Sequence, residues 1–240
     1  MTPRIARRAR LDREQVVAAA LALIDEHGIE GHSMRTLGAR LGVDASTLYY
    51  HVPSKAALHS MIVDAVMAGV DLSADDPSHG PAERLIGAAG EFRRVLMLHP
   101  RAVPLVAARS LRTPTQLAGV EVMLGVLYEA GFSTIEAMVA VDAIGQTVIG
   151  MTGIHAAHLE ADQPGEQEPF ADLPADRFPN LRRMVEEGAY LGFDAEFDAT
   201  VAALVHGLLA RHDAGTLLPA HALPAPLTDA TTDIPGSPAN

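Results

Sequence analysis

The chain contains no cysteine and no tryptophan among its 240 residues, and aromatic residues make up only 4% of it. Without cysteine, neither a disulfide framework nor a cysteine-ligated zinc site is available. Scarce aromatics beside abundant Ala, Leu, Val and Met favour helices over a β sandwich. Because 48% of the residues are apolar, one or two cores can be buried, and we predict an all-α fold.

The sequence also lacks the short motifs of common catalytic sites. It has no glycine-rich phosphate loop, no His-Glu-x-x-His and no nucleophile elbow. We therefore predict neither an enzyme nor a metal site.

Two apolar runs are possible targeting or membrane segments. Acidic residues flank the first run, Val16 to Ile24, which fits one helix face better than a signal peptide. Asp142 and His155 interrupt the second, Ala137 to Leu159. We expect no membrane span and a cytoplasmic protein.

Basic residues are few and unevenly placed. The net charge is −12, yet residues 1–60 hold eight Lys and Arg against six acids, and the remaining 180 hold ten against twenty-four. The first sixty residues thus carry +2 and the rest −14. This polarity directs any attraction for phosphate to residues 1–60.

The segment from Ser33 to Lys55 has the pattern of a helix-turn-helix. Leu37 and Leu41 lie one turn apart, and Gly42 follows where a left-handed residue can end the helix. Asp44 then stands where a side chain can cap a second helix, predicted over 45–51. We therefore expect binding to duplex DNA.

The predicted second helix needs only Leu48 and Val52 in the core. Its other face carries donors and acceptors suited to phosphates and base edges, namely Thr47, Tyr49, Tyr50 and His51. His51 could instead be a core histidine. Neighbours on a helix diverge by about 100°, so one tyrosine can be partly structural, and Tyr50 is the one we place nearest the groove.

Helix start and stop signals and loop-forming residues divide the chain into six parts. The first helix, 12–27, has Asp12 as N-cap, Gln15 as its capping-box partner and Gly28 as its stop. Further helices are predicted at about 34–41, 82–98, 101–110, 115–130, 134–160, 180–190 and 194–213. The predicted parts are a basic arm (1–11), a helix-turn-helix domain (12–54), a connecting helix (55–70), a loop (71–81), a ligand-binding and dimerisation domain (82–213) and a disordered tail (214–240).

Two late helices carry broad apolar stripes. These are Met138, Val141, Gly145, Val148, Thr152, His155 and Leu159 in one, and Phe197, Val201, Leu204, Val205 and Leu208 in the other. Paired across a two-fold axis they would form a four-helix dimer contact, as two DNA half-sites require. Alternatively, the stripes complete the chain's own core.

The first sixty residues resemble the TetR family of bacterial transcriptional regulators. The matching segments are Arg13 to Gly28, Met34-Arg35-Thr36-Leu37 before Leu41-Gly42-Val43, and Leu48-Tyr49-Tyr50-His51-Val52 closed by Lys55. Glu91-Phe92-Arg93-Arg94 and Ala130-Gly131-Phe132-Ser133 resemble the tetracycline-repressor branch, to about residue 160.

The resemblance implies a homodimeric helical repressor whose larger domain binds a small molecule and thereby moves two DNA-reading heads. The DNA contacts it implies are Arg35, Ala45, Ser46, Thr47, Tyr49, Tyr50, His51 and Lys55. Lys55 would clamp a phosphate, and the arm of Arg4, Arg7, Arg8 and Arg10 would supplement the small side chains at 45 and 46. Arg40 is expected only to solvate its helix.

The effector site is less clearly marked. Candidate ligand residues are Phe92, His99, Arg109, Gln146 and His155; the last four are polar residues amid apolar helical stretches, which need partners. Tetracycline-binding relatives chelate a magnesium–drug complex with a histidine in the stretch matching Val103 to Pro114, which has none here. We therefore expect no cofactor, no tetracycline and an effector of unknown identity.

The sequence thus predicts a ligand-responsive regulator released from a palindromic operator. Two alternatives stay open at this point: a ligand-promoted DNA binder, and an architectural protein whose helix-turn-helix is only structural.

Overall fold

The computed structural model describes residues 11–108, 111–160, 173–188 and 191–218, and all regular structure in these ranges is helical. The all-α prediction is confirmed. The arginine arm and most of the predicted tail lie outside the described residues. The helices are α1 (Arg13–His27), α2 (Met34–Leu41), α3 (Ala45–Leu48), α4 (Lys55–Met67), η1 (Leu72–Ala74), α5 (Pro81–Leu98), η2 (Pro100–Ala102), α6 (Val103–Ala107), α7 (Pro114–Glu129), α8 (Thr134–Glu160), α9 (Pro179–Glu186) and α10 (Phe193–Asp213).

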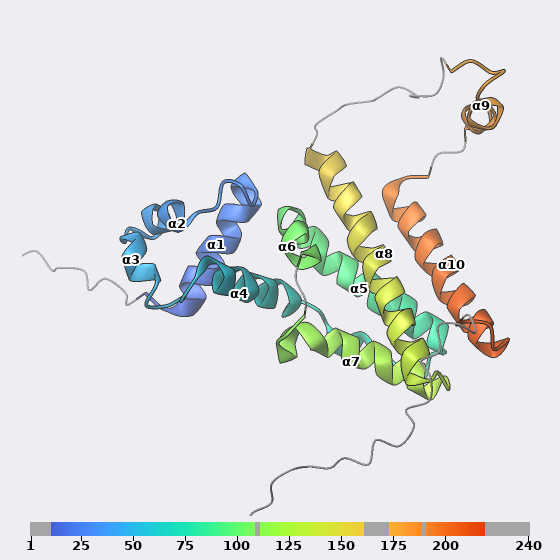
Figure 1. Ribbon diagram of the computed structural model, residues 1–240, viewed down its shortest axis with the longest axis horizontal. Coiled ribbons are helices and arrows are strands. Elements are labelled where there is room, and N and C mark those ends of the chain that lie inside the picture. Colours follow the sequence, from blue (N-terminus) through green and yellow to red (C-terminus); the bar gives the residue numbers. More distant parts are fainter. Residues whose placement is uncertain (1–10, 109–110, 161–172, 189–190, 219–240) are drawn as a thin grey trace, which may run out of the picture.

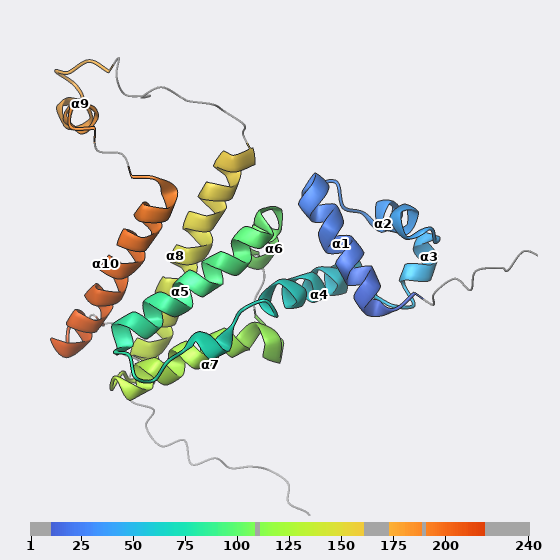
Figure 2. The same ribbon diagram turned by 180° about the vertical axis from the view of Figure 1, so that it is seen from behind.

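The helices form a small unit and a larger body joined by α4 (Figure 1). In the small unit α1 packs on α2 and α4, and α2 packs on α3. In the body α5, α8 and α10 pack side by side, with α7 across α5 and α8. Seen from behind, α9 stands apart from this bundle (Figure 2), and none of its residues is buried. The two-part architecture is the one that the sequence predicts.

Local capping signals fix the helix starts of the small unit. Asp12 accepts a hydrogen bond from the Gln15 backbone N–H at 2.8 Å, and the Gln15 side chain accepts from the Asp12 N–H at 3.1 Å. Ser54 likewise accepts from the Ala57 N–H at 3.0 Å and starts α4. Each such cap satisfies a backbone donor that the helix leaves unpaired.

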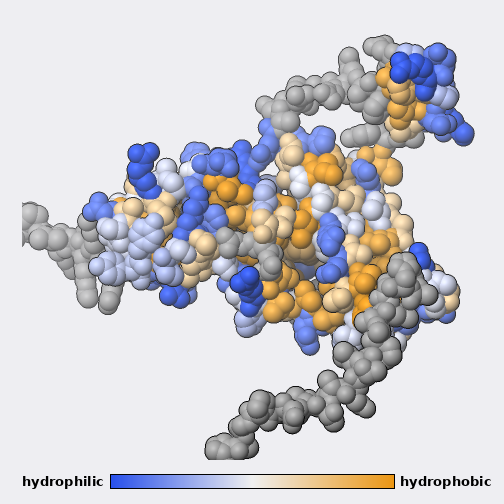
Figure 3. Space-filling view, viewed as in Figure 1, coloured by the Kyte–Doolittle hydropathy of each residue, from blue (hydrophilic) through white to orange (hydrophobic). Residues whose placement is uncertain are grey.

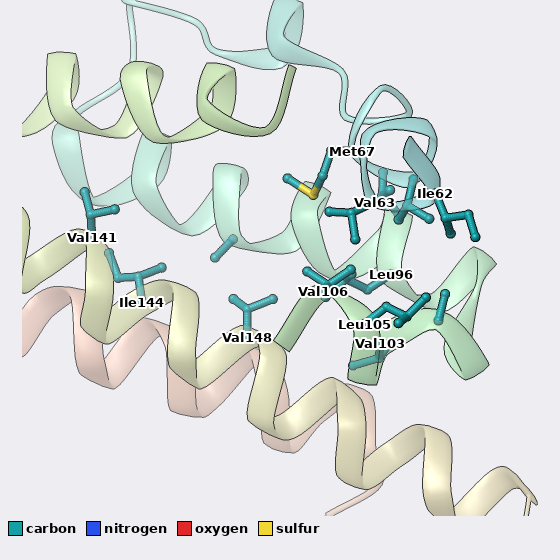
Figure 4. Packing of buried hydrophobic residues seen from close by; sticks show 14 of the residues in the cluster. Ile62, Val63, Met67, Leu96, Val103, Leu105, Val106, Val141, Ile144 and Val148 are labelled. Atoms are coloured by element: carbon teal, nitrogen blue, oxygen red, sulfur yellow. The ribbon is translucent and has the colours of Figure 1, made fainter. Parts of the chain in front are cut away.

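Helix α4 joins the two parts because it buries residues on more than one side. Leu58 and Ile62 are fully buried, as predicted, and Val63 and Met67 are buried as well. Figure 4 shows Ile62, Val63 and Met67 of α4 near Leu96 of α5 and Val106 of α6. Helix α4 is therefore packed into the cores of both the small unit and the body.

The two apolar stripes mainly belong to the chain's own core. Val148 and Thr152 of α8, like Val201 and Val205 of α10, are buried where α8 and α10 pack on each other and on α5. The alternative interpretation of these stripes is thus the better one for most positions. Met138, Ile154 and Leu159 of α8 remain more than half exposed.

By length and composition alone α8 could cross a membrane, with mean hydropathy of 1.4 over its most apolar window. It instead lies among α5, α7 and α10, and a core helix of a helical protein meets the same criteria.

Candidate DNA-binding surface and ligand cavity

The turn between α2 and α3 depends on two glycines. Gly42 has the left-handed conformation expected of a helix stop, with φ 67° and ψ 33°. Gly38 lies against the turn itself, because a Cβ there would stand 2.7 Å from the Val43 carbonyl oxygen. Sequence analysis missed Gly38, since an isolated glycine in a helical pattern gives no hint of what packs against it.

The second helix is shorter than predicted: α3 covers Ala45–Leu48, and a turn continues to His51. Val52 precedes Pro53, which disfavours helical backbone at that position. The turn is closed by a hydrogen bond from the His51 N–H to the carbonyl of Leu48, three residues earlier, at 2.9 Å. Asp44 occupies the N-cap position without a side-chain capping bond, so the expected cap is wrong.

The tyrosines of this element project outward. Tyr50 is 90% exposed and Tyr49 51%, whereas Leu48 and Val52 are fully buried. Ser46 is exposed, and Ala45 and Thr47 are half-buried. The element therefore presents an aromatic and hydroxyl surface over a small apolar anchor.

His51 is hydrogen-bonded to α1, and Lys55 to the loop between α1 and α2. The backbone carbonyl of half-buried His51 accepts a hydrogen bond from Arg13 Nε at 3.2 Å, so the imidazole ring takes no part in this bond. Lys55 Nζ donates to the His32 carbonyl at 3.3 Å, which leaves further N–H groups of its exposed ammonium for a phosphate.

The two arginines of α2 differ in their surroundings. Arg35 is exposed at the start of the helix and makes no side-chain bond to the described residues. Arg40 forms a double hydrogen bond with Glu26 at 2.6 and 2.7 Å, which lowers the pKa of that carboxyl. Of the two, only Arg35 is exposed without a side-chain partner among the described residues.

Behind this surface lies a buried histidine. His32 is 1% exposed, its ring nitrogens have no hydrogen-bond partner, and its ring lies 5.5 Å from that of His59. Burial, and next the positive charges of His59 and Lys55, lower the pKa of His32 from 6.5 to about 4. His32 is thus neutral near pH 7, with both ring nitrogens buried and without hydrogen bonds.

A cavity of about 600 Å³ opens in the body between α4, α5, α7 and α8. Its walls are mostly apolar and include Met67, Phe92, Val106, Met123 and Ile149. Its volume lies in the range of small-molecule sites. It touches α4, the helix that leads to the DNA-binding unit.

The predicted ligand residues divide between this cavity and other places. Phe92 and Gln146 line it. His99 instead bonds Asp25 at 2.9 Å, and His155 bonds Arg93 at 3.1 Å and stacks on Phe193. Both histidines thus have partners in the protein and lie outside the cavity lining; Arg109 lies outside the described residues.

Gln116 is a cavity residue that sequence analysis missed. It is 2% exposed, and its Nε2 donates to Asp64 of α4 at 2.8 Å while its Oε1 accepts from the Arg112 N–H at 2.9 Å. Thr113 also donates to Asp64. The cavity wall is therefore hydrogen-bonded directly to the connecting helix.

A second contact joins the body to the DNA-binding unit at the end of α1. Arg101 donates to the carbonyls of Asp25 and Glu26 and, through Nε, to Glu160 of α8 at 2.8 Å. Together with the His99–Asp25 bond, it fixes the end of α1 to the body. Within the described ranges no three metal-ligating side chains come together.

These features define a helix-turn-helix regulator with a separate ligand-binding body. The model of the C-terminal domain described as "Tetracyclin repressor-like" matches residues 75–212, and that of "Bacterial regulatory proteins, tetR family" matches residues 16–60. The chain belongs to the TetR family. It is a DNA-binding transcriptional regulator.

Similar proteins agree with this assignment. An HTH-type transcriptional regulator of Saccharopolyspora erythraea is 34% identical over 164 residues, 68% of each chain. The class C tetracycline repressor of Escherichia coli is 31% identical, over 83% of this chain and 91% of its own. Apo ActR from Streptomyces coelicolor has the same fold, with a TM-score of 0.75 at 24% identity, covering 86% of this chain and 99% of its own.

Proposed function

We propose that the chain is a homodimeric repressor that binds a palindromic operator and leaves it when a small molecule fills the body cavity. The observation that carries this proposal is the pairing of an outward, 90% exposed Tyr50 with a cavity whose wall bonds α4 through Gln116. The Tyr50 side chain contacts the DNA, and a ligand bound in the cavity displaces α4. The class C tetracycline repressor is a named repressor of similar sequence, and ActR is known in complex with actinorhodin at 25% identity.

The DNA surface we propose is the set named from the sequence: Arg35, Ala45, Ser46, Thr47, Tyr49, Tyr50, His51 and Lys55. Exposed Arg35 and Lys55 flank the tyrosines and supply phosphate contacts at helix starts. Such contacts position the element, and side chains of the 45–50 stretch reach base edges.

For the dimer we propose the outer faces of α8 and α10, opposite the faces buried in the core. Ile154 and Leu159 are exposed apolar residues of α8, and α10 exposes the small residues Ala199, Ala203 and Gly207. Small side chains allow close approach of helices, and a two-fold axis there would present two reading heads. The protein would act in the cytoplasm, without catalysis, cofactor or membrane.

A gel shift with DNA from upstream of its own gene, with and without excess random competitor, tests the proposal. Tyr50→Ala and Lys55→Ala each weaken binding by about 1–3 kcal/mol, and Lys55→Ala also reduces the slope of log affinity against log salt by about 0.9. Tyr128→Ala, a change at an exposed tyrosine of α7, is the matched control and leaves binding unchanged.

Equal retention of random and cognate DNA would refute the sequence-specific regulator and favour the architectural alternative. Tighter operator binding in the presence of a cavity ligand would favour ligand-promoted binding over release.

A further inference from the structure

The cavity is apolar in its walls but strongly acidic in its charged residues. Among its described lining residues are six carboxylates and one arginine, Arg84, with one histidine, His79. The carboxylates are Asp71, Asp75, Asp76, Glu83, Glu91 and Asp142. The charge in and around the cavity therefore favours cationic ligands over anionic ones.

The one lining arginine is already committed to protein carboxylates. Arg84 bonds both oxygens of Asp75 at 2.7 Å and also bonds Glu129. The two carboxylates raise the pKa of Arg84, and Arg84 lowers the pKa of Asp75. Arg94 in the same way neutralises Glu91, with bonds of 2.7 Å. No uncommitted arginine or lysine is left for an anionic ligand among the described lining residues.

Asp142 differs from these paired carboxylates. It lies on α8, exposed at the cavity, and forms no hydrogen bond or ion pair with the described residues. Gln146 lines the cavity one turn further along α8 and is also without a described partner. Residues four apart on a helix face the same way, so Asp142 and Gln146 offer adjacent acceptors beside apolar wall residues such as Phe92 and Met123.

We infer that the effector is an apolar organic cation, an amine or quaternary ammonium or phosphonium compound, whose charge lies at Asp142 and whose body fills the apolar part of the cavity. This inference rests on the proposed role of the cavity as the effector site. Apolar surface provides most of the affinity of such sites, and a few placed polar groups provide specificity. A carboxylate beside apolar walls attracts a cation and repels an anion of the same shape. The net charge of −14 over residues 61–240 acts in the same direction.

Two probes of nearly equal shape and opposite charge test the inference: tetraphenylphosphonium and tetraphenylborate. Titration calorimetry of the full chain measures binding of each. The phosphonium binds at least about tenfold tighter than the borate. Asp142→Asn weakens phosphonium binding by about tenfold and leaves the unfolding temperature unchanged, because the Asp142 carboxylate forms no bond to the described part of the chain.

Asp198→Asn is the matched control. Asp198 is also an exposed acid, on α10 and outside the cavity lining, so this variant binds phosphonium like the wild type. Asp142→Lys reverses the preference and favours the borate. Equal or tighter borate binding by the wild type, binding of neither probe, or an Asp142→Asn variant that binds phosphonium as tightly as wild type would overturn the inference.

A gel shift separates this inference from the regulator proposal. If wild type binds upstream DNA and phosphonium releases it, both stand. If no specific DNA complex forms, the regulator proposal fails, and the calorimetric comparison still decides which charge the cavity accepts. If borate binds as well as the phosphonium while DNA is bound specifically, only the cationic effector is refuted.

Discussion

The DNA-binding end and the ligand-binding body expose their functional groups in opposite ways. At the DNA-binding end the active surface is outward: Tyr50 is 90% exposed above fully buried Leu48. In the body most polar groups around the cavity are paired within the protein, and some of these pairs join distant parts of the chain, as Gln116 does with Asp64, 52 residues away. Figure 3 shows the same contrast, with hydrophobic surface gathered over the body and hydrophilic surface over α1–α3.

The difference indicates which part can change shape. Under the proposed function, the recognition element stays rigid to hold its register on DNA, whereas the body, whose cavity is linked to α4 and to the end of α1, moves when a ligand fills the cavity. Four predictions test this contrast.

The largest effect concerns acid stability of the DNA-binding end. Because the folded-state pKa of His32 is about 4 against 6.5 unfolded, the folded protein binds fewer protons. The contribution of neutral His32 to the free energy of unfolding is therefore fully present above pH 6.5 and is lost as the pH drops toward 4, by up to about 3 kcal/mol. Urea unfolding followed by circular dichroism at pH 7 and pH 4.5 measures the loss.

His32→Leu removes this loss, since the ring nitrogens have no hydrogen bonds to forfeit. His27→Gln, at an exposed histidine of α1, keeps the wild-type acid slope. An unchanged slope in His32→Leu would show that other groups cause the acid sensitivity.

Gly38→Ala tests the rigidity of the turn. In an open helix this change gains about 1 kcal/mol, but here the new Cβ would meet the Val43 oxygen at 2.7 Å. We expect a loss of about 2 kcal/mol and of operator binding, with binding at the cavity retained. Gly125→Ala, with no atom within 4 Å of the added Cβ, is stabilising by about 0.5–1 kcal/mol. Intact operator binding in Gly38→Ala would show that the turn between α2 and α3 can shift to accommodate the added Cβ.

The sequence predicts the DNA-binding end better than the body for a physical reason. The Asp12–Gln15 box and the Gly42 stop depend on neighbours within a few residues, so their residue types suffice. The sequence names His99 and His155 as candidate ligand residues because they are polar amid apolar stretches, and in the structure they bond Asp25 and Arg93, which lie 74 and 62 residues away in the chain. No helical period contains that information.

The same limit explains the stripes of α8 and α10. Their spacing predicts which residues share a face, and Val148 and Val205 do end up buried. Whether that face meets its own chain or a second copy depends on how α5 packs against both helices, and that is a tertiary property. The cavity combines residues of α4, α5, α7 and α8, so its existence could not be predicted from the sequence for the same reason.

The contact between the body and α1 should carry part of the ligand signal. His99→Ala and Arg101→Ala remove side chains that hold Asp25 and Glu26, without touching the recognition element. We expect operator affinity to be kept and ligand-induced release to weaken by about 1–2 kcal/mol of coupling. Gel shifts at increasing ligand concentration measure it, with Arg183→Ala in α9 as control. Release at the wild-type ligand concentration in both variants would leave the Gln116–Asp64 contact as the main route.

The smallest effect separates two caps that look alike in the sequence. Ser54 accepts the Ala57 N–H at 3.0 Å, so Ser54→Ala loses about 1 kcal/mol of stability. Asp44 occupies the equivalent position of α3 without a side-chain capping bond, so Asp44→Ala changes stability by only a few tenths of a kcal/mol. Chemical denaturation of the two variants gives the comparison directly. Equal losses would mean that Asp44 caps α3 in solution; a loss only at Ser54 would show that the recognition element is stable without a side-chain cap at Asp44.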